Sequence, residues 1–519
     1  MLSTLDMAIV AVYALSLFAL AQWVSRESVG HDKDASDYFL AGRSLPWWAI
    51  GASLIAANIS AEQIIGMSGS GYAIGLAIAS YEWMAAITLI IVGKYLLPVF
   101  LKTGIYTMPQ FLEQRYDHRV RMVMAFFWLA VYVFVNLTSI LWLGAMAIDT
   151  VAGVGLNTGL VALGMFAVSY SLYGGLKAVA LTDIVQVVLL VLGGLMIVAV
   201  ILDEVSGGAG VVAGFSLLME RAPEKFDMIL SSDNPHYASL PGISVLIGGM
   251  WVMNLSYWGF NQYIIQRALA AKSLDEAQKG IAFAAFLKLL MPLIVVLPGI
   301  AIFVLDPGLG TPDEAYPRAM TLLPTGIKGL VFAALLAAIV SSLASMCNSI
   351  STIFTVDILP AFAGEKVAEE RRVMVGRLAV GVAMATAMVT AQPLLGQFDQ
   401  AFQYIQEFTG FFTPGIVVIF LLGIFYKHTT SLAALVAALG SALFSIALKI
   451  WWPELPFIDR VGLVFLMCGA LAILLSHAHP GDDIDPIDLD DVSFATSRGF
   501  NISALLVTII LVGLYATWW

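Results

Sequence analysis

The sequence predicts an all-α protein that crosses a membrane many times, and three observations carry this prediction. Of the 519 residues, 60% are hydrophobic and only 12% are charged. The mean hydropathy is +0.90. These values lie far outside the averages of soluble domains and are typical of polytopic membrane proteins. Apolar runs long enough to cross a hydrocarbon core of about 30 Å also recur along the whole chain.

These apolar runs predict about fourteen membrane-spanning helices. The first run begins behind Asp6, with no basic segment before it and no clear small-residue cleavage site, so we expect a retained helix rather than a signal peptide. An even number of spans places both termini on one side of the membrane. The predicted spans are residues 5–25, 45–66, 76–100, 122–150, 157–173, 181–203, 242–262, 280–304, 326–358, 376–394, 400–425, 430–450, 460–477 and 499–518.

The distribution of lysine and arginine predicts the orientation in the membrane. Of the 25 basic residues, about eighteen fall in one set of alternate loops and about six in the other. Cytoplasmic loops carry the excess of positive charge. We therefore expect both termini outside the cytoplasm, in a plasma membrane that in a bacterium is the inner membrane.

Composition and missing motifs exclude several classes of function. Much of the net charge of −11 comes from an acidic loop at 478–498, which we interpret as a solvated linker and which argues against nucleic acid as a partner. Cys347 and Cys468 lie inside apolar runs, so we expect neither a disulfide nor a metal site from them. The chain has no P-loop and no recurring set of nucleophile, base and orienting group. We expect that the protein is not an enzyme and that an ion gradient supplies the energy for transport.

The polar string from Asn58 to Gln63 interrupts an apolar stretch at 47–65. At bilayer depth, amides and a carboxyl group are tolerated only where they face protein or a wet cavity. A broken helix also frees backbone carbonyls for a cation and turns amides toward a solute, as at the midplane of a secondary transporter. This string is therefore a candidate binding site.

A second candidate is a stripe of hydroxyl groups on one helix face. Ala338, Ser341, Ser342 and Ser345 follow the spacing i, i+3, i+4, i+7. Serines in an apolar helix often bond to their own backbone or pack against a neighbouring helix. Alternatively, adjacent hydroxyls together with carbonyls of a broken partner helix supply the oxygen ligands that a sodium ion needs.

Asn254, Tyr257 and Asn261 form another polar face, with Gly259 as a place to bend. Amides and aromatic rings suit a sugar, because its hydroxyls donate and accept while its C–H faces lie on rings. Amide bonding between helices and an aromatic belt at the interface explain the same residues equally well.

Lys288 lies within an apolar run, where a lysine costs about 2.5 to 3.5 kcal/mol on insertion scales. Snorkelling toward the cytoplasmic end is one explanation. Glu82 and Glu407 raise the same question, with exposure at the interface as the alternative. Together with Gln63, the pair Glu82 and Lys288 would offer acceptors and donors to one neutral polyol.

Four segments resemble the solute:sodium symporter family, in its sodium/glucose branch. The likeness runs through nearly the whole chain in the same order. The segments are DYFLAGRSLPWW (37–48), IAANISAEQ (55–63), GFNQYIIQR (259–267) and AIVSSLAS (338–345).

The resemblance implies a LeuT-like architecture, with a five-plus-five inverted repeat, one extra helix before it and three after it. The chain would form a single transmembrane transporter domain in the lipid bilayer. Its parts would be 1–43 (extra helix and cytoplasmic loop), 44–204 (first repeat), 205–241 (extracellular loop), 242–425 (second repeat) and 426–519 (three C-terminal helices).

The resemblance also implies sodium-coupled import of a neutral monosaccharide by alternating access. The sodium ligands would be the carbonyls of Ala56, Ile59 and Ala338 and the hydroxyls of Ser341 and Ser342. The sugar would contact Asn58, Gln63, Glu82, Asn254, Lys288 and Gln406. The gates would be Tyr257, stacked on the sugar at the inner side, and Met67, Tyr81 and Phe402 at the outer side.

Further implications concern the ion and the choice of sugar. Relatives with a second sodium site carry hydroxyls where this chain has Ala344 and Ser345, so Ala344 predicts one sodium per sugar. Ala85 replaces a serine of the galactose-carrying relative, which leaves galactose versus glucose open. Asp183 would line the sodium exit or cap a helix.

Other functions stay open at this stage. The same fold could carry myo-inositol, proline, pantothenate or sialic acid, although a sialic acid carrier should place an arginine near the site and the arginines here fall in loops or near helix ends. A passive channel or sensor is a more distant alternative. A homodimer is compatible with the sequence but is not indicated by it.

Overall fold

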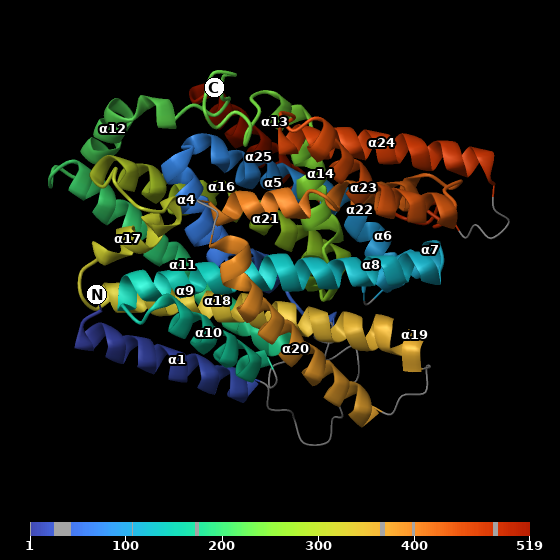
Figure 1. Cartoon of the computed structure of the whole chain (residues 1–519), viewed down its shortest axis with the longest axis horizontal. Coiled ribbons are helices and arrows are strands. Elements are labelled where there is room, and N and C mark those ends of the chain that lie inside the picture. Colours follow the sequence, from blue (N-terminus) through green and yellow to red (C-terminus); the bar gives the residue numbers. More distant parts are fainter. Residues whose placement is uncertain are drawn as a thin grey trace.

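The computed structural model describes residues 2–24, 43–105, 107–171, 176–363, 369–396, 400–480 and 486–519. These residues form helices joined by turns and irregular loops, with one isolated bridge between Leu45 and Ala271. The prediction of an all-α fold is therefore confirmed over the described part of the chain. The axes of most long helices lie nearly parallel or antiparallel to one another, as in a bundle (Figure 1).

The α-helices cover nearly all of the predicted spans. In the first half they are α1 (Thr4–Val24), α3 (Trp47–Asn58), α4 (Met67–Ala73), α5 (Ser80–Ile91), α6 (Leu97–Thr103), α7 (Met108–Arg115), α8 (His118–Val131), α9 (Thr138–Ala152), α10 (Leu156–Ser171), α11 (Leu176–Val205) and α12 (Val211–Arg221). In the second half they are α13 (Ser244–Ile247), α14 (Gly249–Leu255), α15 (Gln262–Leu269), α16 (Leu274–Leu305), α17 (Ala315–Thr321), α18 (Ile327–Thr352), α19 (Leu359–Ala363), α20 (Glu369–Leu395), α21 (Ala401–Thr409), α22 (Thr413–Phe425), α23 (Ser431–Trp451), α24 (Phe457–Ala478) and α25 (Arg498–Thr517).

Short turns of other helix types join these α-helices. The π-helical turns are η2 (Glu62–Gly66), η4 (Val92–Leu96), η5 (Tyr132–Leu137), η7 (Ser256–Phe260) and η9 (Ile353–Ile358). The 3₁₀ turns are η3 (Leu76–Ala79), η6 (Pro223–Lys225) and η8 (Pro312–Glu314).

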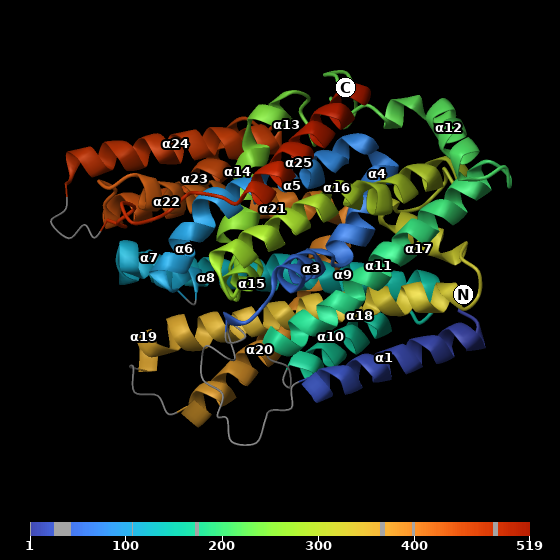
Figure 2. The same ribbon diagram turned by 180° about the vertical axis from the view of Figure 1, so that it is seen from behind.

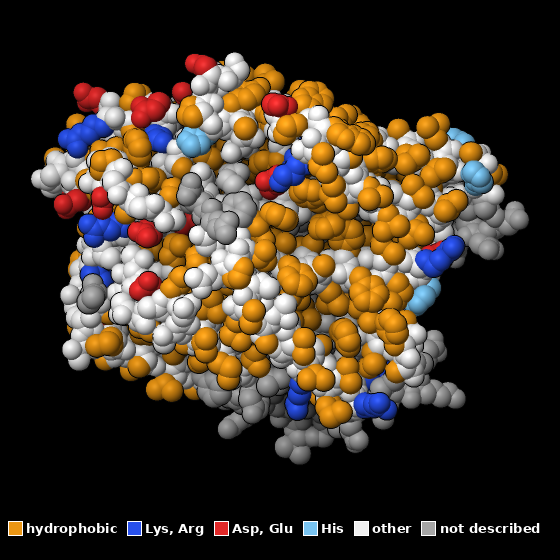
Figure 3. Space-filling model, in the orientation of Figure 1, with side chains coloured by type: hydrophobic (Ala, Val, Ile, Leu, Met, Phe, Trp, Pro, Cys, Tyr) orange, Lys and Arg blue, Asp and Glu red, His pale blue; other side chains and the backbone are white. Residues whose placement is uncertain are grey.

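The described helices form a membrane-spanning bundle. Nine helical stretches in this part of the chain are long and apolar enough to cross a membrane, and eleven if each of two bent pairs is one span. Hydrophobic side chains cover the middle of the visible face, while acidic side chains gather toward one end (Figure 3). Each of the fourteen predicted spans coincides with a helix or an interrupted helix, although fourteen crossings stays a prediction.

Two predicted spans are bent. The pair α3 and η2–α4 bends by 65°, between Asn58 and Glu62, where the polar string predicts a break. The pair α21 and α22 bends by 45°, between Thr409 and Thr413. The sequence predicts one uninterrupted helix over 400–425, and this prediction was wrong in that respect. Two side chains of α22, Thr413 and Ile416, lie beside the cavity described below.

Helix α16 lies at the centre of the bundle, against α3, α4, α5 and α11 (Figure 2). Close contact with α4 depends on glycine. A Cβ atom on Gly299 would lie 2.0 Å from the Ser68 carbonyl oxygen, and one on Gly71 would lie 2.6 Å from that of Val296. These contacts place α16 directly behind the broken helix.

Substituting Gly299 with alanine is expected to destabilise the protein. The new methyl group would meet backbone atoms of α4, and overpacking of this kind costs about 1 to 3 kcal/mol or more. The melting temperature of the purified protein in detergent measures the effect. Gly513→Ala is the matched control, because nothing lies within 4 Å of the added atom. Equal melting temperatures for the two variants would contradict the packing argument.

Both ends of the described chain lie toward the side of α12 and α17, away from α7 and α19 (Figures 1 and 2). The long segment between α11 and α14 lies on the same side. The two ends of the chain are thus on the side predicted to bear the 205–241 loop.

Candidate functional site

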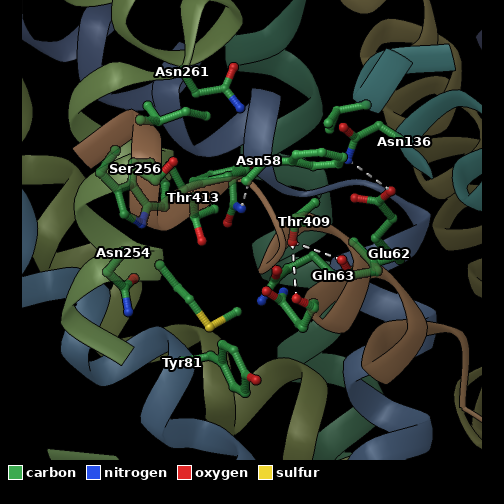
Figure 4. Close-up of a pocket in the computed structure, with 18 of the residues that line it drawn as sticks. Asn58, Glu62, Gln63, Tyr81, Asn136, Asn254, Ser256, Asn261, Thr409 and Thr413 are labelled. Atoms are coloured by element: carbon green, nitrogen blue, oxygen red, sulfur yellow. Dashed lines mark hydrogen bonds between the residues drawn. The ribbon is translucent and has the colours of Figure 1, made fainter. Parts of the chain in front are cut away.

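A cavity of about 120 Å³ lies beside the break between α3 and η2. Its walls come from both halves of the chain, including α5, η5, η7, α16, α21 and α22. Figure 4 shows Asn58, Gln63, Tyr81 and Asn254 around one open space. All the side chains that the resemblance assigns to the sugar line this one cavity, and these are Asn58, Gln63, Glu82, Asn254, Tyr257, Lys288 and Gln406.

The break itself has a simple backbone cause. The amide of Ile59 still donates to the Ile55 carbonyl at 2.7 Å, but the amide of Ser60 turns to the Asn58 carbonyl at 2.8 Å. The Ala56 carbonyl therefore loses the amide that would continue the α-helix. The helix ends with polar groups at membrane depth that face protein and cavity rather than lipid.

Three π-helical turns border the cavity: η2 carries Gln63, η5 carries Asn136 and η7 carries Tyr257. A π turn inserts an extra residue and shifts the side chains that follow it, and such turns are frequent at functional sites. Behind η7 the chain leaves the helix at Asn261, whose side chain accepts from the Tyr263 amide at the start of α15. Helix α14–α15 is thus interrupted in the middle, like α3–α4.

A buried ion pair forms one wall. The Lys288 ammonium lies 2.6 Å from a Glu82 carboxylate oxygen, and it also donates to the Asn58 side-chain oxygen. Lys288 is completely buried, and the exposed fraction of Glu82 is 3%. The face of Trp258 lies 4.8 Å from the ammonium, which adds a cation–π contact. Lys288 therefore does not snorkel, and the pair brings no net charge to the cavity.

Tyr257 closes one side of the cavity. Its hydroxyl accepts from the Asn58 side-chain amide at 3.1 Å and lies 2.6 Å from the Tyr263 hydroxyl. Tyr263 in turn donates to the Ala57 carbonyl at 3.2 Å. These hydrogen bonds connect η7 and α15 to the broken end of α3. A gate residue between two moving parts would require such a connection.

Aromatic side chains from α5 and α21 also line the cavity. Tyr81 and Phe402 meet edge to face with ring centroids 5.1 Å apart, and both line the cavity. Met67 is buried, and its sulfur accepts from the Gln63 amide at 3.2 Å. Met67 itself does not line the cavity. Of the three predicted outer-gate residues, Tyr81 and Phe402 thus contact each other at the cavity, and Met67 accepts from Gln63.

The predicted sodium ligands come from two helices that pack against each other, α3 and α18. The Ser342 hydroxyl is buried and has no hydrogen-bond partner within the described residues. A buried hydroxyl without a partner is costly, and a cation would satisfy it. Together with the Ala56 carbonyl freed by the break, it fits a small cation bound by neutral oxygens. Ala338, Ser341 and Ile59 are buried in the same region.

Polar groups to which the sequence analysis assigned no specific role also line the cavity. Glu62 accepts from the Ser139 hydroxyl and from the Asn136 side-chain amide (Figure 4). Thr409 and Thr413 also line the cavity. An asparagine and a serine inside the apolar run 122–150 were visible signals, whereas their pairing with Glu62 depends on the fold.

Three further residues named from the sequence are not among the described lining residues of the cavity. Glu407 pairs with Lys449 at 2.7 Å and with Arg460 at 3.0 Å, so it ties α21 to α23 and α24 instead of facing solvent alone. Ala85 is buried but does not line the cavity. Asp183 lies in α11, and its side chain is outside the described part of the structure.

One arginine lies deeper than its position near a helix end suggests. Arg267 is buried, with an exposed fraction of 2%, and donates to the Ser53 and Ser345 hydroxyls. It does not line the solute cavity, and neither does any other arginine in the described ranges. The described lining of the cavity therefore lacks the arginine expected near the site of a sialic acid carrier.

The fold and the cavity define a class of protein: a helical membrane transporter with a solute cavity beside a broken helix. The family model of the sodium:solute symporter family matches residues 38–440, and the chain belongs to this family. It is a multi-pass membrane protein and a sodium-coupled solute symporter, not an enzyme.

Similar proteins fall within the same class. The sodium/glucose cotransporter of Vibrio parahaemolyticus is 51% identical over 100% of this chain and 99% of its own length. The human sodium/myo-inositol cotransporter is 33% identical over 82% of this chain and 64% of its own length. A solved structure of a sodium-coupled sialic acid symporter has a TM-score of 0.79, at 22% identity, over 92% of this chain and 98% of that one.

Proposed function

We propose that this protein imports a neutral monosaccharide, glucose or galactose, together with one sodium ion. The observation that carries the proposal is that the cavity offers no unpaired cation among its described lining residues. Lys288 is neutralised by Glu82, and the second carboxyl group, Glu62, accepts hydrogen bonds from Ser139 and Asn136. The remaining groups include amides, hydroxyls and aromatic rings. Such a lining recognises hydroxyl groups without demanding a charge on the solute. The similarity to a sodium/glucose cotransporter supports this choice.

Each predicted side chain has a role in this proposal. Asn58, Gln63, Asn254 and Gln406 bind sugar hydroxyls, and the pair of Glu82 and Lys288 binds as acceptor and donor. The sodium ion lies between α3 and α18, on the Ala56, Ile59 and Ala338 carbonyls and the Ser341 and Ser342 hydroxyls.

The proposed architecture is an inverted repeat of residues 44–204 and 242–425. The interruptions of α3–α4 and α14–α15 support it, because each falls in the first helix of its repeat. We place the 205–241 segment and both termini outside the cytoplasm, in a plasma membrane that in a bacterium is the inner membrane. The three helices of 426–519 then follow the second repeat.

Coupling in this proposal arises from differential binding. Sodium holds the broken α3 against α18, which shapes the sugar site and favours the state open to the outside. Sugar closes Tyr81 and Phe402 over the cavity, and the repeats then rock. Sodium leaves toward the cytoplasm past Asp183, and Tyr257 moves to release the sugar.

The driving force is sufficient for accumulation. One charge moved through 100 mV yields about 2.3 kcal/mol, and a tenfold sodium gradient adds about 1.4 kcal/mol. The sum supports accumulation of a neutral sugar by roughly 500-fold at one sodium per sugar.

Gln63→Ala is expected to weaken sugar binding about tenfold while sparing the affinity for sodium. Gln63 lines the cavity, whereas the proposed ion ligands of this broken helix are the backbone carbonyls of Ala56 and Ile59. Sodium and sugar titrations of intrinsic tryptophan fluorescence separate the two affinities. Equal losses of both would contradict the division of roles.

A competition panel tests the substrate class. Unlabelled galactose, glucose, myo-inositol, proline and sialic acid would each be tested as a competitor of labelled galactose in sodium-dependent binding. The proposal predicts that a hexose competes best, and that proline and sialic acid do not compete. If myo-inositol competed best, the protein would still be a sodium-coupled symporter, but its solute would be myo-inositol rather than a hexose, as for the related myo-inositol cotransporter.

A further inference from the structure

A second cavity, of about 260 Å³, lies between α1, α10, α11 and α18. It shares no lining residue with the solute cavity. Its walls are almost entirely aliphatic and aromatic, and they include Leu17, Leu163, Phe166, Leu336 and Val340. This second cavity therefore has a different chemistry from the solute site.

Two polar atoms interrupt the apolar lining. The side-chain oxygen of Gln186, on α11, has no hydrogen-bond partner in the described part of the chain, and the residue is 98% buried. The Tyr13 hydroxyl, on α1, is likewise buried without a partner there. Unsatisfied groups of this kind are unfavourable at bilayer depth. One acceptor and one hydroxyl thus border the same apolar space.

The cavity lies at the edge of the bundle. Helices α1 and α10 are adjacent outer helices in both views (Figures 1 and 2). Phe166 of α10 contributes to the cavity wall, yet 47% of its surface is exposed on the outside of the bundle. Since that outside is apolar, a molecule dissolved in the hydrocarbon of the bilayer can reach the cavity between these two helices.

We propose that the second cavity is a binding site for a lipophilic alcohol or phenol from the bilayer. Its hydroxyl would donate to the Gln186 oxygen and accept from Tyr13, and its hydrocarbon part would fill the apolar space. Size agrees with this class, because a dry cavity of about 150 Å³ already holds benzene. A purely apolar molecule would leave both polar atoms unsatisfied, and a charged one would find no counterion among the lining residues.

Photolabelling with a diazirine derivative of 1-octanol tests the proposal. The purified full-length protein in lipid nanodiscs would be irradiated over a range of probe concentrations, and the adducts mapped by mass spectrometry. We expect saturable adducts on residues of α1, α10 or α18 that line the cavity, displaced by excess 1-octanol. Gln186→Leu should raise the concentration for half-saturation about fivefold, the factor of one neutral hydrogen bond.

The controls separate a specific site from general partitioning. Gln392→Leu makes the same change on the exposed face of α20 and should leave labelling unchanged. Ala14→Leu fills the cavity from α1 and should abolish the cavity adducts. Tyr13→Phe provides a second polar deletion if Gln186→Leu lowers the melting temperature. Non-saturable labelling, or identical labelling in the wild type and in the Gln186→Leu, Tyr13→Phe and Ala14→Leu variants, would overturn the proposal.

Discussion

Lys288→Met is expected to abolish solute uptake and to lower the stability of the protein strongly. The substitution keeps the length of the side chain but leaves the Glu82 carboxylate buried without its cation. Breaking a buried pair from one side costs about 3 to 5 kcal/mol. It also removes the donor to Asn58, whose amide holds Tyr257. Sodium-dependent uptake and the melting temperature measure the two effects.

The double variant Lys288→Met, Glu82→Gln separates folding from function. It removes both charges, so we expect most of the stability to return while uptake stays absent. Lys449→Met is the control. It removes the cation of a half-exposed pair with Glu407, which contributes about 0 to 1 kcal/mol to the free energy of unfolding. Wild-type uptake by the single Lys288→Met variant would remove this pair from the proposed site.

Ser342→Ala is expected to raise the sodium concentration for half-maximal uptake about tenfold or more. The Ser342 hydroxyl is buried without a protein partner among the described residues, so its loss should cost the folded state little. An oxygen ligand to a full charge contributes about 1.5 to 3 kcal/mol, and 1.4 kcal/mol is a factor of ten. The measurement is the sodium dependence of sugar uptake at fixed sugar concentration.

Ser349→Ala is the matched control for that variant. Ser349 is buried two turns further along α18, and its hydroxyl donates to the Ser345 carbonyl at 3.1 Å. We expect unchanged sodium activation in this control. If Ser342→Ala behaved in the same way, Ser342 would not be a sodium ligand.

Sequence patterns predicted the break in α3 because polarity at bilayer depth has few physical explanations. Asn58 and Gln63 could not face lipid, and the structure turns both toward a cavity. The same reasoning required a partner or a purpose for Lys288. It could not identify the partner, since Glu82 lies 206 residues away and meets Lys288 only after α5 packs on α16.

Other features were beyond local reasoning. The π turns at Asn136 and Tyr257 leave no hydropathy signal, because a π turn adds one residue without changing the apolar character of the helix. The bend between α21 and α22 was missed although Gly410 and Pro414 lie beside it, because glycine and proline are also tolerated within continuous membrane helices. The role of Glu62 as an acceptor for Ser139 and Asn136 depends on packing between distant segments. Sodium ligands and sugar contacts stay predictions.

The most direct test of the account is uptake of labelled galactose and glucose by proteoliposomes of the purified protein, with and without an inward sodium gradient. We predict accumulation above the external concentration that requires sodium and collapses when an ionophore dissipates the gradient. Flux that only equilibrates the sugar, at the same rate with or without sodium, would contradict coupled symport. Absence of transport of either hexose, with sodium still changing the tryptophan fluorescence, would contradict the choice of sugar.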